Sequence, residues 1–336
     1  MDNNPVTIGI VGCGAHAQIA HITYFIKHPR CKVLALCDAD IRKIDHLSSK
    51  YNIPHKYQDI QELLDNEEIE ALIVAAPNLL HGAMVISALK YGKHVFCENP
   101  IALSKVEAQE IIDTVHSTGK KCALTMNNRL RQDVATLRKF IQGGELGDIY
   151  YVKTGWLIGS DEWVLSRNRM DRMQSSGGAF LNLGIGLLDI ALYFLKNKTP
   201  STIFASIHTK EQNTQVEDTA LCMINFSDHT LLTIEVGWSL LFEQDFLYCN
   251  VFGKKGAALL NPLRIQKELH DDLFNVTPTI AHQNLYRESY ERQANAFIQY
   301  ILDNTPPLIS LEDGLLIARI CEAFYESAQS QTLVTI

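Results

Sequence analysis

Short apolar runs alternate with amphipathic stretches along the first 125 residues of the chain. Runs of β-branched and aliphatic residues predict buried strands, and stretches with apolar positions three and four residues apart predict helices. The expected strands are Val6–Val11, Val33–Cys37, His55–Tyr57, Ala71–Ala76, His94–Cys97 and Cys122–Thr125. The expected helices include Ile41–Tyr51, Ile60–Asp65, His81–Tyr91 and Ser104–Thr118. This alternation predicts an α/β fold with a doubly wound parallel sheet, a Rossmann domain over residues 1–125.

The pattern changes after residue 126, where several strands follow one another without helices between them. These strands are expected at Ile149–Trp156, Ile203–His208, Thr219–Phe226, Leu231–Trp238, Phe246–Phe252 and Ala257–Leu260. Helices are expected at Asp133–Gln142, Gly178–Lys196, Tyr286–Leu302 and Leu311–Ser327. Consecutive strands favour antiparallel pairing, so we expect an α+β domain over residues 126–336 with a large, open, mostly antiparallel sheet. Its C-terminal helices could pack back on the first domain.

A glycine-rich turn follows the first expected strand and opens a helix. Its sequence, Gly12-Cys13-Gly14-Ala15-His16-Ala17, fits the pattern G-x-G-x-x-G/A of dinucleotide-binding turns. Gly12 permits the tight turn, and Gly14 lets the backbone approach a pyrophosphate whose charge the helix N-terminus stabilises. Ala17 is small enough for close packing of helix on strand. The turn therefore predicts a dinucleotide cofactor, with Ala15 and His16 among the residues that line it.

An acidic residue follows the second expected strand. Asp38 lies 24 residues beyond Gly14, close to the roughly 20-residue interval at which an acid reaches the ribose hydroxyls of the cofactor. A carboxylate at this place repels a 2′-phosphate, so NAD is expected rather than NADP. Arg42 lies one helical turn further along and is close enough to moderate that preference.

Composition narrows the classes of partner and the compartment. The formal net charge of −8 argues against DNA or RNA binding, which depends on Lys and Arg contacts to phosphates. No apolar run approaches the roughly 20 residues that cross a bilayer, and the first residues lack the regions of a signal peptide, so we expect a cytoplasmic protein. The eight cysteines include no C-x-x-C pair, which predicts reduced, buried thiols. His and Cys do not cluster at ligand spacing, so no metal site is expected.

Four further segments are not explained by folding rules. They are Ala76-Pro77-Asn78-x-x-His81, Gly92–Pro100, Asn127–Leu130 and Gly177–Phe180. In the order and spacing of these motifs the chain resembles the Gfo/Idh/MocA family of nicotinamide-dependent oxidoreductases. The resemblance implies hydride transfer to or from a sugar, cyclitol or related hydroxyl compound, and a homodimer or homotetramer formed through the open face of the second sheet. It also implies a set of residues that line the cofactor: Ala76, Pro77, Asn78, His81, Glu98 and Asn99.

The chain departs from the family pattern where the family handles the proton. The family triplet Glu-Lys-Pro is Glu98-Asn99-Pro100 here, and an Asp and a His four residues apart on one helix fall on Asn182 and Gly186. Asn99 can donate a hydrogen bond but carries neither a charge nor a transferable proton. Asn182 and Gly186 should still share one helical face, which Asp189 continues one turn further. Asp189 is the first candidate for the proton acceptor and Tyr193 the second, although the resemblance implies that an acid at the place of Asp189 is more often structural than catalytic.

The loop that precedes this helix carries several arginines. Arg167, Arg169 and Arg172 lie between Trp163 and Gly177. They are either solvated surface residues or part of a substrate site that prefers carboxylated or phosphorylated compounds, which arginine binds through two parallel hydrogen bonds. Trp163 either packs in the core or forms an apolar wall for a sugar ring.

Two interpretations of the function follow. The first is an active NAD-dependent oxidoreductase with an altered set of proton-handling residues. The second is a catalytically silent NAD-binding sensor or partner subunit. The absence of a side chain at Gly186 leaves room, which either admits a bulkier substrate or indicates that the site has lost its catalytic role. The intact cofactor pattern favours the enzyme.

Overall fold

The computed structural model describes residues 4–159, 177–209, 216–280 and 284–336. The chain forms two compact units. The first unit holds residues 1–127 and 286–318, and the second holds residues 128–285 and 319–336. The first unit therefore includes a segment from near the C-terminus.

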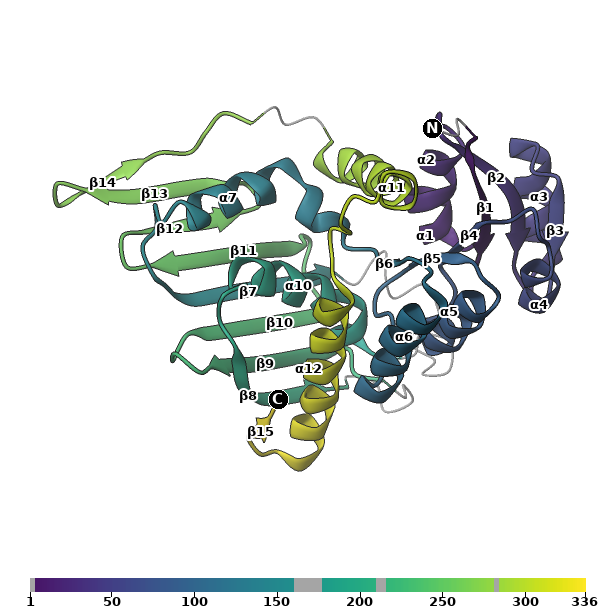
Figure 1. The fold of residues 1–336 in the computed structure, drawn as a ribbon. Helices are drawn as coiled ribbons and strands as arrows, with labels where there is room; N and C mark the ends of the chain where they lie inside the picture. Colours follow the sequence, from purple (N-terminus) through teal and green to yellow (C-terminus); the bar gives the residue numbers. More distant parts are fainter. Residues whose placement is uncertain (1–3, 160–176, 210–215, 281–283) are drawn as a thin grey trace. The chain divides into compact units, whose positions relative to one another are not determined.

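A six-stranded parallel sheet forms the centre of the first unit (Figure 1). Its strands are β1 (Val6–Val11), β2 (Cys31–Cys37), β3 (His55–Tyr57), β4 (Ala71–Val74), β5 (His94–Cys97) and β6 (Cys122–Leu124). They lie in the order β3-β2-β1-β4-β5-β6, the order of dinucleotide-binding folds. The direction of winding reverses between β1 and β4, and ligands of such sheets bind beyond the carboxyl ends of the strands at that point. The predicted parallel sheet is confirmed.

Helical segments connect these strands. They are α1 (Ala15–Ala17), the π-helical turn η1 (Gln18–Ile22), α2 (Thr23–Phe25), α3 (Ile41–Tyr51), α4 (Ile60–Leu64), the 3₁₀ turn η2 (Asn78–Leu80), α5 (His81–Lys90) and α6 (Lys105–Thr118). Side chains of Asp40, Asp59 and Ser104 accept hydrogen bonds from the free amides at the starts of α3, α4 and α6. Such N-caps fix where a helix begins.

A helix from near the C-terminus completes the core of the first unit. In α11 (Leu285–Asp303) the fully buried Phe297 stacks on Phe96 of β5 with ring centroids 4.6 Å apart. The same ring meets Phe25 of α2 edge to face at 6.3 Å. Aromatic rings bury large apolar areas, so these contacts make α11 an integral part of the first unit.

The second unit contains a nine-stranded sheet (Figure 1). Its strands are β7 (Ile149–Gly159), β8 (Pro200–His208), β9 (Thr219–Phe226), β10 (Leu231–Leu240), β11 (Phe246–Gly253), β12 (Gly256–Leu260), β13 (Arg264–Leu269), β14 (Asp272–Asn275) and β15 (Val334–Thr335). The order is β14-β13-β12-β11-β7-β10-β9-β8-β15, and β7 and β10 form a parallel pair among antiparallel ones. The predicted mostly antiparallel sheet is confirmed, but no strand was expected at β13 to β15.

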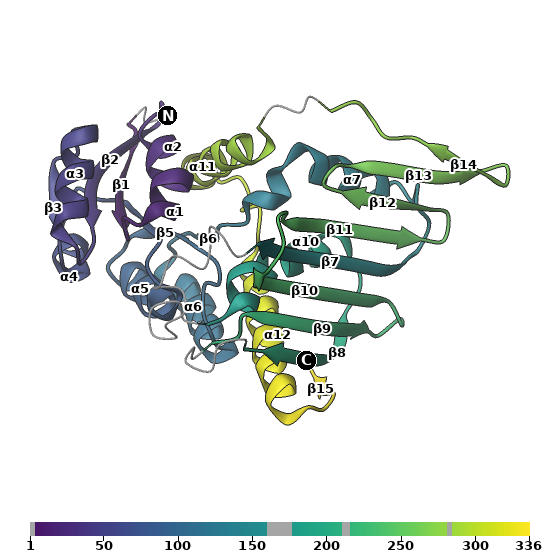
Figure 2. The same cartoon turned by 180° about the vertical axis from the view of Figure 1, so that it is seen from behind.

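Helices cover one face of this sheet, and Figure 2 shows no helix of the described part of the second unit over the other face. The covering elements are α7 (Gln132–Gln142), the π-helical turn η5 (Phe180–Gly184), α10 (Ile185–Phe194) and the C-terminal part of α12 (Leu311–Ser330). The alternation along β9 follows this arrangement, since Cys222 and Ile224 are buried whereas Leu221 and Met223 are exposed. The sequence predicted one regular helix over Gly178–Lys196, and the π turn η5 is a departure from it.

Two expectations from composition are tested by the fold. All eight cysteines are free and buried, as predicted. Among the helices in the described part of the chain, none is long and apolar enough to cross a membrane.

We predict that Phe297→Ala lowers the free energy of unfolding of the first unit by about 3–5 kcal/mol, because it leaves a cavity beside Phe96. Urea unfolding followed by circular dichroism measures the loss. The matched control is Glu291→Ala on the exposed side of the same helix, for which a change within about 0.5 kcal/mol is expected. Equal effects of the two variants would show that α11 does not belong to this core.

Candidate functional site

The glycine turn after β1 depends on the absence of a side chain at Gly12. Gly12 has a φ of +86°, and a Cβ at this place would lie 2.3 Å from the carbonyl oxygen of Ala75, beyond β4. Only glycine tolerates both conditions. A Cβ on Gly14, by contrast, would meet no atom of the described residues within 4 Å. The turn therefore presents open backbone at the N-terminus of the following helix, as a pyrophosphate requires.

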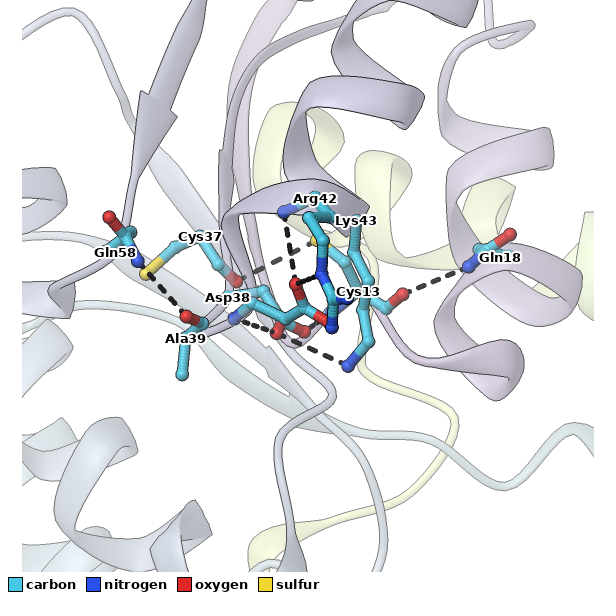
Figure 3. Close-up of polar contacts among 9 residues, drawn as sticks. Cys13, Gln18, Cys37, Asp38, Ala39, Arg42, Lys43 and Gln58 are labelled. Carbon is cyan, nitrogen blue, oxygen red and sulfur yellow. Dashed lines mark hydrogen bonds and ion pairs between the residues drawn. The ribbon is translucent and has the colours of Figure 1, made fainter.

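Asp38 is held in place by the backbone around it (Figure 3). One carboxylate oxygen accepts a hydrogen bond from the amide of Cys13 at 2.8 Å, and the other accepts one from the amide of Asp40 at 2.9 Å. The bond from Cys13 joins the end of β2 to the glycine turn after β1, and the bond from Asp40 is local. A carboxylate fixed in this way fits the hydroxyls of a cofactor ribose, because each oxygen keeps accepting capacity.

Two cations accompany Asp38. The ammonium of Lys43 lies 3.5 Å from its carboxylate. The guanidinium of Arg42 is bound instead to Asp40 at 3.1 Å, and its side chain is 88% exposed. The hydrogen bond from Arg42 lowers the pKa of Asp40. In this structure Arg42 is therefore paired with Asp40, two residues beyond the predicted ribose-binding Asp38.

Cys13, inside the turn, plays no ionic part. Burial, reinforced by the charge of Asp38, raises the pKa of the Cys13 thiol to about 12. The group is therefore a neutral thiol at physiological pH and fills space beneath the turn.

The buried His81 joins two loops at the same edge of the sheet. Its Nε2 lies 2.7 Å from the carbonyl oxygen of Ala76, and its Nδ1 lies 2.7 Å from that of Pro100. Pro77 precedes the 3₁₀ turn η2, which begins at Asn78. The ring thus fixes the loops after β4 and β5 to each other, and the predicted cofactor residues Ala76 and His81 lie in contact.

Glu98, directly after β5, is surrounded by hydrogen-bond donors. Its Oε1 lies 2.9 Å from Nε2 of His16 and 2.5 Å from Nε2 of His21. Its Oε2 accepts a hydrogen bond from the Thr125 hydroxyl at 2.6 Å. Burial would raise the pKa of this carboxyl, but the two imidazoles outweigh burial and hold the pKa well below its usual range. Glu98 is therefore an anion at the carboxyl end of β5.

Asn99 follows Glu98 and lies against Met126. Its Nδ2 is 3.0 Å from the sulfur of Met126. Its Oδ1 is buried and has no hydrogen-bond partner among the described residues. An unpaired buried amide oxygen is costly unless a ligand or water supplies a donor, which suits a residue that binds a hydroxyl group.

The predicted residues of the second unit lie on η5 and α10. The Nδ2 of Asn182 donates to the carbonyl oxygens of Gly177 and Gly178 at 3.1 and 2.9 Å, so this side chain supports the turn that starts the helix. Within the part of the chain that the structure describes, a Cβ on Gly186 would have one neighbour within 4 Å, the Nδ2 of Asn128 at 3.5 Å. The space beside Gly186 could therefore hold a larger side chain or part of a ligand.

Asp189 forms a buried ion pair. It is fully buried, and its carboxylate takes the Arg129 guanidinium in a two-pronged contact whose shortest distance is 2.6 Å. The Tyr193 ring lies between two cations, 5.1 Å from the guanidinium carbon of Arg129 and 4.9 Å from that of Arg138. A proton acceptor must reach its substrate. This geometry favours a positioning role for Asp189 and Tyr193.

The residues predicted from sequence and those at the observed site differ in two respects. Trp163, Arg167, Arg169 and Arg172 lie outside the described residues. Sequence analysis did not single out His21 or Thr125, both of which contact Glu98. A signal for His21 was present, since it follows His16 by five residues on the same expected helix, but a regular helix would place the two on different faces.

Comparison with protein-family models places both halves of the chain. Residues 6–126 match the model described as "Oxidoreductase family, NAD-binding Rossmann fold", and residues 138–336 match "Oxidoreductase family, C-terminal alpha/beta domain". The chain belongs to the Gfo/Idh/MocA oxidoreductase family. The predicted family and the predicted class of NAD-dependent oxidoreductase are confirmed, and the findings support the enzyme rather than the sensor.

Individual relatives agree along the whole chain. D-glucoside 3-dehydrogenase of Escherichia coli K12 is 28% identical, with 100% of this chain and 99% of that protein covered. Myo-inositol 2-dehydrogenase of Thermotoga maritima is 24% identical, with 98% of each covered. Among solved structures, levoglucosan dehydrogenase in complex with NADH and levoglucosan superposes with a TM-score of 0.87 at 20% identity, covering 99% of this chain and 100% of that one. This last likeness shows a shared fold.

We predict that Asp189→Asn lowers the free energy of unfolding by about 3–5 kcal/mol, because it leaves the Arg129 cation buried without its anion. Thermal and urea unfolding measure the change. The control is Glu288→Gln, which breaks the exposed pair with Arg292 on α11 and should cost less than about 1 kcal/mol. Full stability of Asp189→Asn together with loss of activity would instead identify Asp189 as a proton acceptor.

Proposed function

We propose that this protein is an NAD-dependent dehydrogenase that oxidises, or forms in reverse, a secondary hydroxyl on the ring of a sugar or cyclitol. The observation that carries the proposal is the Asp38 carboxylate bound to the amide of Cys13 at 2.8 Å, beside a turn that is open at Gly14. The relatives support the substrate class, because a D-glucoside and myo-inositol both offer ring hydroxyls to the enzymes named for them.

The preference for NAD over NADP rests on charge. Asp38 is fixed by two backbone amides and cannot swing away without losing both bonds. A 2′-phosphate would be repelled by it. Lys43, at 3.5 Å, reduces this repulsion without removing the carboxylate. Gly12, Gly14, Ala15, His16 and Ala17 would hold the pyrophosphate end of the cofactor.

We assign the substrate site to residues that can contact the substrate but cannot take up its proton. The nicotinamide accepts or donates the hydride. Asn99 would hold the reacting hydroxyl through its amide, whose oxygen lacks a partner among the described residues. Asn182 keeps the start of the helix in place, and Gly186 leaves room for a bulky ring substituent. We further propose that Trp163, Arg167 and Arg169 contact the substrate, with the arginines favouring a carboxylated or phosphorylated compound.

The remaining assignments concern assembly and compartment. The uncovered face of the large sheet carries exposed apolar side chains, among them Phe204 and Met223, which are cross-strand neighbours. Apolar patches of this kind commonly mark subunit interfaces. We propose a homodimer or homotetramer formed through this face. A reducing compartment such as the cytoplasm suits a chain whose eight cysteines are all free.

The activity is tested by mixing the purified protein with NAD⁺ and a panel of D-glucosides, inositols and their carboxylated and phosphorylated analogues, and recording absorbance of the reduced cofactor. We expect substrate-dependent reduction of NAD⁺. The triple variant Asn99→Lys, Gly186→His, Asn182→Asp should lower kcat/KM by more than about tenfold. The lysine and imidazole side chains occupy space that the substrate uses, and Asn182→Asp removes the donor that supports the start of the helix.

The surface variant His46→Ala serves as the control for that assay and should match the unmodified protein. A rise in activity of the triple variant from a very low starting level would contradict the proposal. It would show that the site had been abandoned and that substitution had rebuilt it.

The interface is tested with Leu221→Glu and Met223→Glu, which place buried charge on the proposed contact. We predict that the double variant sediments at the mass of a monomer in analytical ultracentrifugation, whereas the unmodified protein sediments as a dimer or tetramer. Val106→Glu is the matched control, since Val106 is also an exposed apolar residue but lies on α6. An unchanged mass of the double variant would exclude this face as the interface.

A further inference from the structure

Two imidazoles and a carboxylate converge within the first unit. His16 lies on α1, His21 on the π turn η1, and Glu98 directly after β5. One ligand atom from each of the three lies within 4.8 Å of the others. Both Nε2 atoms face the same oxygen of Glu98, at 2.9 and 2.5 Å. Segments far apart in the sequence therefore aim three donor atoms at one small volume.

The π turn explains how the two histidines share a face. In a regular α-helix, residues five apart point about 140° away from each other, because the helix turns about 100° per residue. A π turn accommodates one more residue per turn, so the fifth residue returns close to the direction of the first. The π turn η1 (Gln18–Ile22) begins two residues after His16 and contains His21. Single π turns inside α-helices recur at functional sites, and this one brings His21 alongside His16.

The second oxygen of Glu98 is fixed by groups that are not metal ligands. Oε2 accepts hydrogen bonds from the Thr125 hydroxyl at 2.6 Å and from the amide of Asn99 at 3.3 Å. Hydrogen bonds of this kind orient a carboxylate ligand and are a regular feature of metal sites. They leave Oε1 as the oxygen directed at the two histidines.

Exposure of the three side chains is graded. His21 is fully buried, Glu98 is 17% exposed and His16 is 57% exposed. A metal held by the three would be enclosed by protein on the side of His21 and accessible on the side of His16. Such a site keeps a position open for water or another ligand, as zinc sites made of two histidines and a glutamate do.

We propose that His16, His21 and Glu98 bind a divalent transition-metal ion of the Zn²⁺ class. Imidazole nitrogens select such ions over Mg²⁺ and Ca²⁺, which prefer oxygen ligands throughout. The proposal departs from the expectation from sequence that the chain has no metal site, because these three ligands are brought together only in the folded chain. Asn99 carries no charge, so a bound cation would supply positive charge beside it. Only the use of that charge at a reacting hydroxyl rests on the proposed dehydrogenase function; the metal site itself does not.

The site is tested with the full chain, stripped of metal by a chelator and titrated with Zn²⁺ by calorimetry and with Co²⁺ by absorption spectroscopy, without nucleotide. We expect a single equivalent to bind and Co²⁺ to give the intense visible absorption of a four- or five-coordinate site. His16→Ala should weaken binding by more than about tenfold, and Thr125→Val by about tenfold through the loss of the bond that orients Glu98.

Folding and the cofactor are controlled separately. His16 is exposed, so its alanine variant should keep the unmodified thermal unfolding temperature, and His46→Ala, on the exposed face of α3, should keep full metal affinity. Equal Zn²⁺ affinity in the unmodified protein and in His16→Ala, or six-coordinate Co²⁺ absorption only, would overturn the proposal. Because the titration contains no NAD, its failure would leave the dehydrogenase assignment unaffected, and the reverse also holds.

Discussion

The carboxylate of Asp38 accepts hydrogen bonds from the amides of Cys13 and Asp40, and the bond from Cys13 connects the end of β2 to the turn after β1. The turn itself exists only because Gly12 has no Cβ to meet the carbonyl of Ala75. One steric constraint and one fixed anion therefore shape the turn after β1. The loops after β4 and β5 extend the same edge of the sheet, joined through His81 and ending at Glu98.

Sequence patterns predicted the parts of this architecture that repeat along the chain or that only a few residue types can form. The apolar strands, the glycine turn and Asp38 follow from local rules, and β1, β2 and α3 form where they were expected. Strands β13 and β14 were missed because their side chains are mostly exposed and show no apolar period. The approach of His21 to Glu98 was missed for a different reason: it depends on a π turn, which a pattern based on 3.6 residues per turn does not contain.

The two units differ in how they use their titratable groups. In the second unit Asp189 forms a buried ion pair with Arg129, and the Tyr193 ring contacts the guanidinium groups of Arg129 and Arg138. These contacts stabilise the helix that carries Gly186. In the first unit Glu98 gathers two imidazoles at an accessible edge next to Asn99. Charge that could influence a reacting hydroxyl is therefore concentrated after β5.

The central claim is that Asp38 meets the ribose of NAD, and the most direct measurement compares the affinities of NADH and NADPH by fluorescence titration of the unmodified protein and of Asp38→Asn. The account predicts that NADH binds the unmodified protein more tightly by about tenfold or more, a difference of about 1.4 kcal/mol. Asp38→Asn should lose most of that difference in affinity. Asp45→Asn, on the following helix α3, should keep it. Tighter binding of NADPH than NADH by the unmodified protein would contradict the account.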